Sequence, residues 1–224
     1  MFKAKMVLID VDGTLVDSVP DLAFCVDEML KQLQMPVRGE AAVRQWVGNG
    51  VQRLVERALT NALDGYPDTT LFERAMPIFM DLYAENTSKR SRLYDGVLEG
   101  LDFLQSCKGL KIGCVTNKAA QFTHPLLQDL GIFDRFAIII SGDTLPEKKP
   151  HPLPLLHAAE TFNVSPADSL MIGDSKSDVT AARAAGFQII CVTYGYNHGE
   201  DIRHYHPDAV IDSMAELHNL ISCN

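Results

Sequence analysis

The sequence predicts an α/β protein whose core is a doubly wound parallel sheet. Three observations support this prediction. Short apolar runs recur along the chain without alternating polar residues, which indicates strands buried on both faces. Segments with helical periodicity separate most of these runs, as expected when helices connect parallel strands. The interval from Asp17 to about Lys89 contains helical patterns and no strand-like run, so it predicts a small all-helical insert after the first strand.

The predicted elements follow in chain order. The predicted strands are "MVLI" at 6–9, "KIGCVTN" at 111–117, "FAIIIS" at 136–141, "SLMIGD" at 169–174 and "QIICVTY" at 188–194. The predicted core helices cover 97–107, 119–130, 152–163 and 177–185. In the insert, helical periodicity marks "DLAFCVDEMLKQL", "GVQRLVERALTNAL" and "TLFERAMPIFMDLYAEN". We therefore expect a discontinuous core domain, 1–16 and 88–224, and a helical domain, 17–87.

Composition and charge exclude several classes of protein. A content of 46% apolar residues is ample for a packed core. The formal net charge of −9 argues against nucleic-acid or anionic-membrane partners, which are held by clustered Lys and Arg. The apolar run at 6–9 is too short for a signal peptide, and no segment is long enough to span a membrane. Oligomeric state stays open between monomer and homodimer.

The five cysteines form an odd set without a C-x-x-C pair. Neither a disulfide framework nor a zinc site of paired cysteines is therefore expected. This usage fits a reducing compartment, so we expect a cytoplasmic protein.

Polar residues follow the predicted strands where each strand ends, which is the edge at which open parallel sheets bind ligands. The first strand ends in "DVDGT" at 10–14, and the second ends in Thr116, Asn117 and Lys118. The fourth ends in "GDSKSD" at 173–178, and Lys149 precedes a predicted helix. Each group alone has an ordinary explanation as a helix cap, a turn or an exposed lysine. Their joint occurrence indicates one site.

These groups resemble the four motifs of the haloacid dehalogenase superfamily: D-x-D-G-T, a strand-terminal Ser or Thr, a Lys, and G-D-x-x-x-D. They stand here as "DVDGT", Thr116, Lys149 in "KPHP", and "GDSKSD". Within the superfamily, the insert, "WVGNGVQRLVERAL" and "SGDTLPEKKPHPLPLL" look like the phosphoglycolate phosphatases. The resemblance spans nearly the whole chain and implies a Rossmann-like core with a helical cap domain.

The paired acids suit phosphate ester chemistry. Asp10 is the candidate nucleophile, because a carboxylate can attack phosphorus and form an aspartyl-phosphate. Asp12 can protonate the leaving alkoxide and then deprotonate the water that cleaves the intermediate. The resemblance implies that an acid at the position of Asp12 marks phosphate hydrolysis or mutase transfer rather than dehalogenation.

A phosphate dianion cannot approach this many carboxylates without a cation. Two like charges 4 Å apart repel by about 4 kcal/mol at an effective dielectric constant of about 20. A hard divalent cation offsets this repulsion, and Mg²⁺ suits a site with few protein ligands. We expect Mg²⁺ to be bound by the carboxylates of Asp10 and Asp174 and by the backbone carbonyl of Asp12. Asp178 is expected to hold a metal-bound water or to orient Lys149.

The remaining site residues are assigned to the substrate. The predicted phosphate-binding groups are the Thr116 hydroxyl, the backbone N–H groups of Asn117 and Gly13, and Lys149. The rest of the substrate, a small carboxylate if it is phosphoglycolate, requires a cation or several N–H donors. The candidates are Gly48, Asn49, Gly50, Arg53 and Lys118, with Arg44 less favoured.

The sequence therefore predicts a cytoplasmic, Mg²⁺-dependent phosphatase for a small phosphomonoester, with 2-phosphoglycolate as the best candidate. One alternative is a phosphatase for another small substrate, such as a sugar phosphate or a nucleotide. A phosphosugar mutase is a second alternative. A binding protein on a catalytically retired scaffold is a third, although every motif residue is intact.

Overall fold

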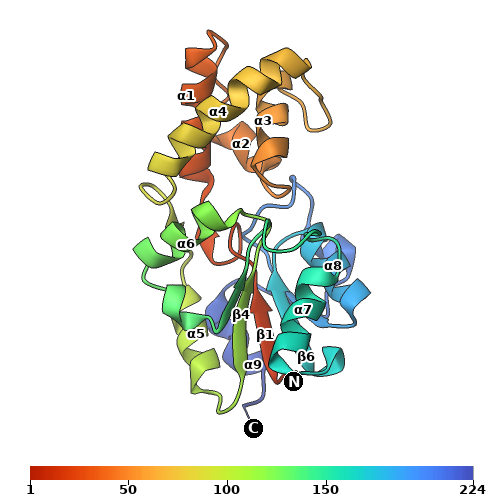
Figure 1. Cartoon of the computed structure of the whole chain (residues 1–224). Coiled ribbons are helices and arrows are strands. Elements are labelled where there is room, and N and C mark those ends of the chain that lie inside the picture. The colour runs from red at the N-terminus through yellow and green to blue at the C-terminus, as the bar shows by residue number, and fades with distance from the viewer. Residues whose placement is uncertain (224) are drawn as a thin grey trace.

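The computed structural model describes residues 1–223 and has a six-stranded parallel sheet at its centre (Figure 1). The strand order is β5-β4-β1-β6-β7-β8. Five strands lie where the sequence predicts them: β1 (Met6–Ile9), β4 (Lys111–Val115), β5 (Ile138–Ile140), β6 (Ser169–Gly173) and β7 (Gln188–Val192). The sequence analysis missed β8 (Ala209–Ile211), because a three-residue apolar run is too short to identify. The predicted doubly wound fold is confirmed.

Helices cover both faces of this sheet, which explains why the strands are continuously apolar. Figure 1 shows α5 (Val97–Ser106) and α6 (Ala120–Asp129) on one side, and α7 (Leu153–Phe162) and α8 (Lys176–Ala185) on the other. Successive residues of β1 enter opposite hydrophobic clusters: Val7 and Ile9 pack on one face, and Met6 and Leu8 on the other. The short helix α9 (Leu217–Leu220) closes the chain against the first face.

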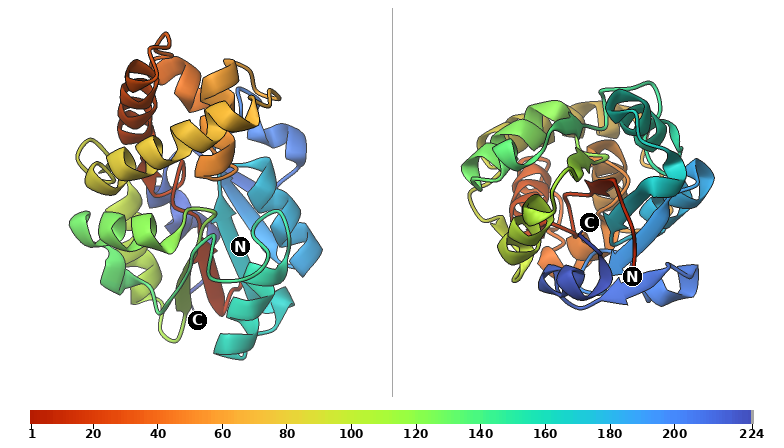
Figure 2. Two further views of the ribbon diagram at one scale, coloured as in Figure 1. Left: turned by 45° about the horizontal axis from the view of Figure 1, so that its top comes forward. Right: turned by 90° about the horizontal axis from the view of Figure 1, so that it is seen from below.

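The insert forms four helices that lie beyond the carboxyl ends of the strands (Figures 1 and 2). They are α1 (Val19–Gln32), α2 (Glu40–Trp46), α3 (Val51–Thr60) and α4 (Thr69–Glu85). These helices share a hydrophobic cluster of their own, which two core residues, Phe122 and Tyr196, also join. The sequence analysis left α2 unassigned, since seven residues give little periodicity.

The chain leaves the core and returns to it through two adjacent crossings. Two-residue strands, β2 (Val16–Asp17) and β3 (Arg92–Leu93), pair antiparallel there. Beside them, the fully buried carboxylate of Asp21 accepts hydrogen bonds from the backbone N–H groups of Arg90 and Ser91, at 2.7 to 3.0 Å. The Ser91 hydroxyl donates to the same carboxylate at 2.7 Å. Asp21 therefore ties the outgoing crossing to the returning one.

The two ends of the chain meet at the amino edge of the sheet, opposite the insert (Figure 1). Phe2 donates its backbone N–H to the carbonyl of Leu220 at 2.7 Å, and Ser222 donates to the carbonyl of Phe2 at 3.0 Å. Cys107 and Cys223 are joined there in a disulfide, with Cα atoms 4.8 Å apart. The sequence analysis expected no disulfide framework and did not identify this single pair, because its cysteines are 116 residues apart and leave no local spacing signal. No helix among residues 1–223 has the length and apolar character needed to cross a membrane.

We predict that Asp21→Ala lowers the free energy of unfolding by about 3 kcal/mol, because it leaves the buried N–H of Ser91 and the partly buried N–H of Arg90 without an acceptor. Urea denaturation followed by circular dichroism measures this change. Glu28→Ala is the matched control on the same helix, where the lost partner is the exposed Lys31, and we expect a much smaller effect. A loss below about 1 kcal/mol for Asp21→Ala would contradict the role given to this carboxylate.

Candidate active site

The sheet order brings the polar residues at the strand ends together. Strands β4, β1 and β6 are neighbours, with Ile9 paired to Cys114 on one side and to Ile172 on the other. Asp10, Thr116 and Asp174 therefore follow three adjacent strands at the same edge. Together with Lys149, which precedes α7, they line one pocket beneath the insert.

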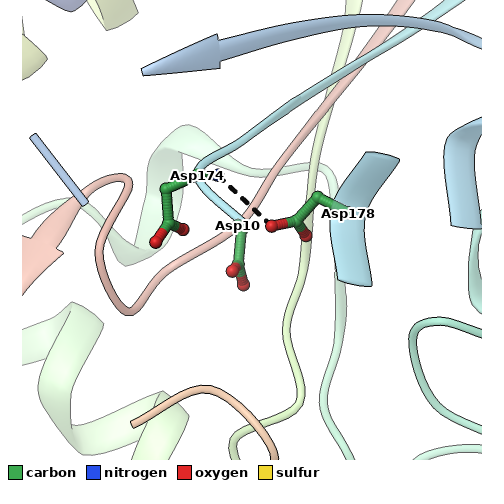
Figure 3. Close-up of side chains that lie close together, drawn as sticks. All are labelled: Asp10, Asp174 and Asp178. Atoms are coloured by element: carbon green, nitrogen blue, oxygen red, sulfur yellow. Dashed lines mark hydrogen bonds between the residues drawn. The ribbon is translucent and has the colours of Figure 1, made fainter. Parts of the chain in front are cut away.

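Three buried carboxylates converge at this edge. Asp10, Asp174 and Asp178 each offer an oxygen, and these oxygens lie within 4.8 Å of one another (Figure 3). Asp178 is already engaged: its Oδ2 accepts hydrogen bonds from the backbone N–H groups of Asp174 and Ser175 and from the Ser175 hydroxyl. Its Oδ1 accepts from Lys149 Nζ at 2.7 Å. Asp178 accepts more hydrogen bonds than Asp174 does, so Asp10 and Asp174 are the candidate ligands for a cation.

Lys149 is almost completely buried, and three oxygen atoms surround its ammonium group. Nζ forms an ion pair with Asp10 Oδ1 at 2.8 Å, and it donates hydrogen bonds to Asp178 Oδ1 and to the carbonyl of Val115. The Asn117 side chain donates to the Lys149 carbonyl at 2.8 Å, which fixes the backbone of this loop. Lys149 thus reaches the candidate nucleophile with its orientation set by its neighbours.

Asp174 is held rigidly through both of its oxygens. Oδ1 accepts from the Thr14 hydroxyl at 2.8 Å, and Oδ2 accepts from the backbone N–H of Tyr196 at 2.6 Å. Gly13 has φ +90°, and a Cβ there would lie 2.3 Å from Asp174 Oδ2. A side chain at this position is therefore excluded by both backbone strain and collision.

The charges of this site are out of balance. Burial raises the pKa of Asp10 to about 7, Lys149 opposes this shift, and Asp178 adds to it. Burial also raises the pKa of Asp174 well above its ordinary value, and Asp178 and Asp10 contribute further. Burial is the largest cause of both shifts, and the repulsion of the neighbouring carboxylates adds to it. Carboxylate oxygens are the donors that Mg²⁺ prefers, so the residues present fit such an ion.

Asp12 does not belong to the acid cluster. Its Oδ1 accepts from the Ser18 hydroxyl at 2.6 Å, and Lys118 Nζ donates to both carboxylate oxygens, at 2.9 and 3.2 Å. Asp12 and Lys118 both line the pocket. Asp12 therefore lies two residues after the candidate nucleophile, Asp10, and forms its own ion pair with Lys118.

The expectation that the backbone N–H of Gly13 binds the phosphate was wrong. Its N–H donates to the carbonyl of Val16 at 2.9 Å, because the chain turns back on itself directly after the motif. It is therefore engaged and cannot meet a phosphate in this arrangement. Thr116 and Asn117 do line the pocket, as expected.

The insert closes the pocket with one loop and an apolar surface. Gly48 and Gly50 line it, as expected for this loop. The apolar lining residues, which the sequence did not single out, are Leu22, Val47, Val51 and Leu54. The free volume is ≈ 50 Å³, against about 300 to 1,000 Å³ for typical pockets that bind drug-sized ligands. The enclosed space thus suits a ligand of few atoms.

Two residues expected to read the substrate lie outside this pocket. Arg53 forms an ion pair with Glu56 at 2.7 Å and donates to the carbonyls of Leu63 and Gly65. It is therefore occupied with the loop after α3. The Asn49 side chain accepts from Arg57 at 2.9 Å and does not line the pocket. The less favoured Arg44 is likewise bound to Asp17 and Glu40.

Sequence reasoning also missed residues of the core. Thr14 and Ser175 lie inside the recognised motifs, so their positions could have suggested that they support the carboxylates. Ser177 and Tyr196 complete the pocket lining. Tyr196 lies in the loop after β7, and only the fold brings it to Asp174.

Known proteins share both the sequence and the architecture. A family description for haloacid dehalogenase-like hydrolases matches residues 4–186. A phosphoglycolate phosphatase from Nitrosococcus oceani is 65% identical, covering 97% of this chain and 96% of the relative. Another from Thiobacillus denitrificans is 49% identical, covering 95% and 93%.

Among solved structures, a predicted phosphoglycolate phosphatase from Haemophilus somnus superposes with a TM-score of 0.91 at 35% identity, over 98% of this chain and 99% of that one. Sequence, fold and the set of strand-end residues thus agree, and the chain belongs to the haloacid dehalogenase-like hydrolase family.

Proposed function

We propose that this protein is a Mg²⁺-dependent phosphatase that hydrolyses 2-phosphoglycolate to glycolate and phosphate. The observation that carries the proposal is the convergence of Asp10, Asp174 and Lys149 at the base of one small pocket. Relatives that cover nearly the whole chain bear the name phosphoglycolate phosphatase, which supports the choice of substrate. A cytoplasmic location is part of the same proposal.

In the first step, an Asp10 carboxylate oxygen forms a bond to phosphorus, and the bond from phosphorus to the glycolate oxygen breaks. Asp12 transfers a proton to that oxygen, so glycolate leaves as an alcohol. In the second step, Asp12 takes a proton from water, and the water oxygen displaces Asp10 from phosphorus. Lys149, the Thr116 hydroxyl and the backbone N–H of Asn117 are the proposed partners of the phosphate oxygens.

The proposed ligands of Mg²⁺ are the Asp10 and Asp174 carboxylates and the Asp12 backbone carbonyl. When bound there, the ion neutralises carboxylate charge and draws electron density from the phosphate oxygens. Asp178 accepts a hydrogen bond from Lys149 and so holds the lysine in place.

We further propose that residues 17–87 are a cap domain on a core formed by 1–16 and 88–224. A cap over the strand ends excludes bulk water while Asp10 attacks. The small free volume favours a two-carbon substrate over a sugar phosphate or a nucleotide.

Phosphate release from a panel of small phosphomonoesters, with and without Mg²⁺, tests this proposal. We expect the highest kcat/KM for 2-phosphoglycolate and a loss of turnover when EDTA removes the metal. Higher kcat/KM for a hexose phosphate or a nucleotide would contradict the substrate assignment. Transfer of phosphate to a second sugar, without release, would identify a mutase instead.

Asp10→Asn should abolish turnover, by a factor of at least about 10³, because an amide cannot act as the nucleophile. The variant should keep its circular dichroism spectrum, since the change is nearly isosteric. Asp168→Asn, which alters an exposed carboxylate paired with Lys5, is the matched control and should retain full activity. Appreciable activity in Asp10→Asn would remove the covalent mechanism.

Metal-free protein should lose stability as pH rises from about 4 to about 7. Asp10 has a folded-state pKa of about 7, raised from 3.8, so the folded state binds this proton more tightly than the unfolded chain does. Mg²⁺ must compete with the proton in this range. The rise in Tm caused by Mg²⁺ should therefore be larger at about pH 8 than at about pH 5.5, as measured by differential scanning fluorimetry.

The same measurement on two variants controls for non-specific effects of the ion. Asp174→Asn should lose most of the Mg²⁺ effect, and Asp168→Asn should keep it. An equal rise in Tm at both pH values would show that the acid cluster is not where Mg²⁺ binds.

A further inference from the structure

We propose that Lys118 of the core and Tyr83 of the cap are positioning residues that hold Asp12 in place for proton transfer. This inference rests on the proposed function and adds a specific requirement to it. The chemistry at Asp12 then depends on a hydroxyl group that only the cap supplies.

The contacts form a chain across the boundary between cap and core. Lys118 Nζ donates to both oxygens of Asp12, at 2.9 and 3.2 Å, and it also donates to the Tyr83 hydroxyl. An ammonium group has three hydrogens, so these acceptors use all of them. Tyr83 lies on α4, which contacts α6 of the core (Figure 1). The cap therefore completes the hydrogen bonding of a core lysine whose other partner is Asp12.

The depth of burial sets this group apart from a surface ion pair. The side chain of Lys118 is 3% exposed, and that of Asp12 is 17% exposed. Tyr83 is fully buried. Burying an ammonium group on folding has a large desolvation penalty, which only well-placed hydrogen-bond partners offset. Charge-assisted hydrogen bonds of this kind are short and directional, so they restrict the orientation of the Asp12 carboxylate.

Packing alone does not require the Tyr83 hydroxyl. Its ring packs against Phe79 of α4, with ring centres 5.5 Å apart, and against Phe122 of α6, at 4.6 Å. A phenylalanine would keep both contacts. The hydroxyl instead meets the lysine that holds Asp12, which points to a role in chemistry at that carboxylate rather than in the hydrophobic cluster.

Fixing Asp12 matters because proton transfer needs a defined donor position. The Ser18 hydroxyl, at 2.6 Å, is the other donor to Asp12, and it comes from the crossing into the cap. Asp12 is therefore held from the core by Lys118 and from the crossing by Ser18. Without Tyr83, one hydrogen of Lys118 loses its acceptor, and the lysine can turn away from Asp12.

A comparison of two leaving groups distinguishes a loss of Asp12 positioning from a general disruption of the active site. Cleavage of 2-phosphoglycolate releases an alkoxide, which needs a proton from Asp12. Cleavage of acetyl phosphate breaks the bond from phosphorus to acetate, which leaves as a stable carboxylate and needs no proton. The rate of phosphoenzyme formation from each substrate, in single turnover with rapid quenching and Mg²⁺ present, is the measurement.

Tyr83→Phe should slow phosphoenzyme formation from 2-phosphoglycolate about tenfold, as expected for a lost hydrogen bond to a charged group. The rate from acetyl phosphate should change by less than about twofold. Lys118→Met should give a larger loss with 2-phosphoglycolate, about 100-fold, because Asp12 loses both hydrogen bonds that orient its carboxyl group. Lys118→Arg should recover part of that loss, since a guanidinium can also bridge a carboxylate.

Tyr205→Phe is the matched control. Its hydroxyl donates to the exposed carboxylate of Glu200, and neither residue lines the pocket. It should leave both rates unchanged.

Equal losses with both substrates, or no loss in Tyr83→Phe, would overturn the positioning role and leave the proposed function standing. If the unmodified protein forms no phosphoenzyme from either substrate, the proposed function fails and this inference fails with it. The behaviour of the unmodified protein therefore distinguishes the two failures.

Discussion

Uncompensated negative charge at the end of the central strands is the constraint on which the rest of the structure depends. Three buried carboxylates meet there, and Lys149 forms ion pairs with two of them, Asp10 and Asp178. Hydrogen bonds from uncharged groups hold two of these carboxylates in place. Thr14 and Tyr196 donate to Asp174, and Ser175 donates to Asp178. Gly13 and Gly195 omit side chains that would collide with Asp174. The fold thus holds an excess of negative charge in a rigid arrangement, and a hard cation would stabilise it.

The position of β1 explains how this arrangement is reached from distant parts of the sequence. It is flanked by β4 and β6, so residues that follow these three strands become neighbours although more than 160 residues separate Asp10 from Asp174. The insert begins directly after the first motif, so it lies over the carboxyl ends of the strands without a long linker (Figure 2). The parallel topology of the sheet and the point of insertion together place the carboxylates, Lys149 and the helical insert at one edge of the sheet.

The sequence was sufficient for features encoded locally and insufficient for those created by packing. Continuous apolar runs predicted five strands, and the motif residues at their ends do converge. The short elements α2 and β8 left too little pattern to identify. Arg53 was misplaced because a sequence shows a charge but not the carbonyl groups that capture it. Tyr83 gave no signal, since an aromatic residue at helical spacing normally indicates packing and its hydroxyl meets Lys118 only in the folded chain.

The pairing of the two chain ends has a practical consequence for engineering. Phe2 and Ser222 are joined by backbone hydrogen bonds at the edge of the sheet farthest from the pocket. A fusion partner, an affinity tag or a surface-immobilisation handle attached to either end would project away from the substrate entrance. For the same reason, a short peptide could bridge the termini in a circular permutant, with new ends opened in an exposed loop.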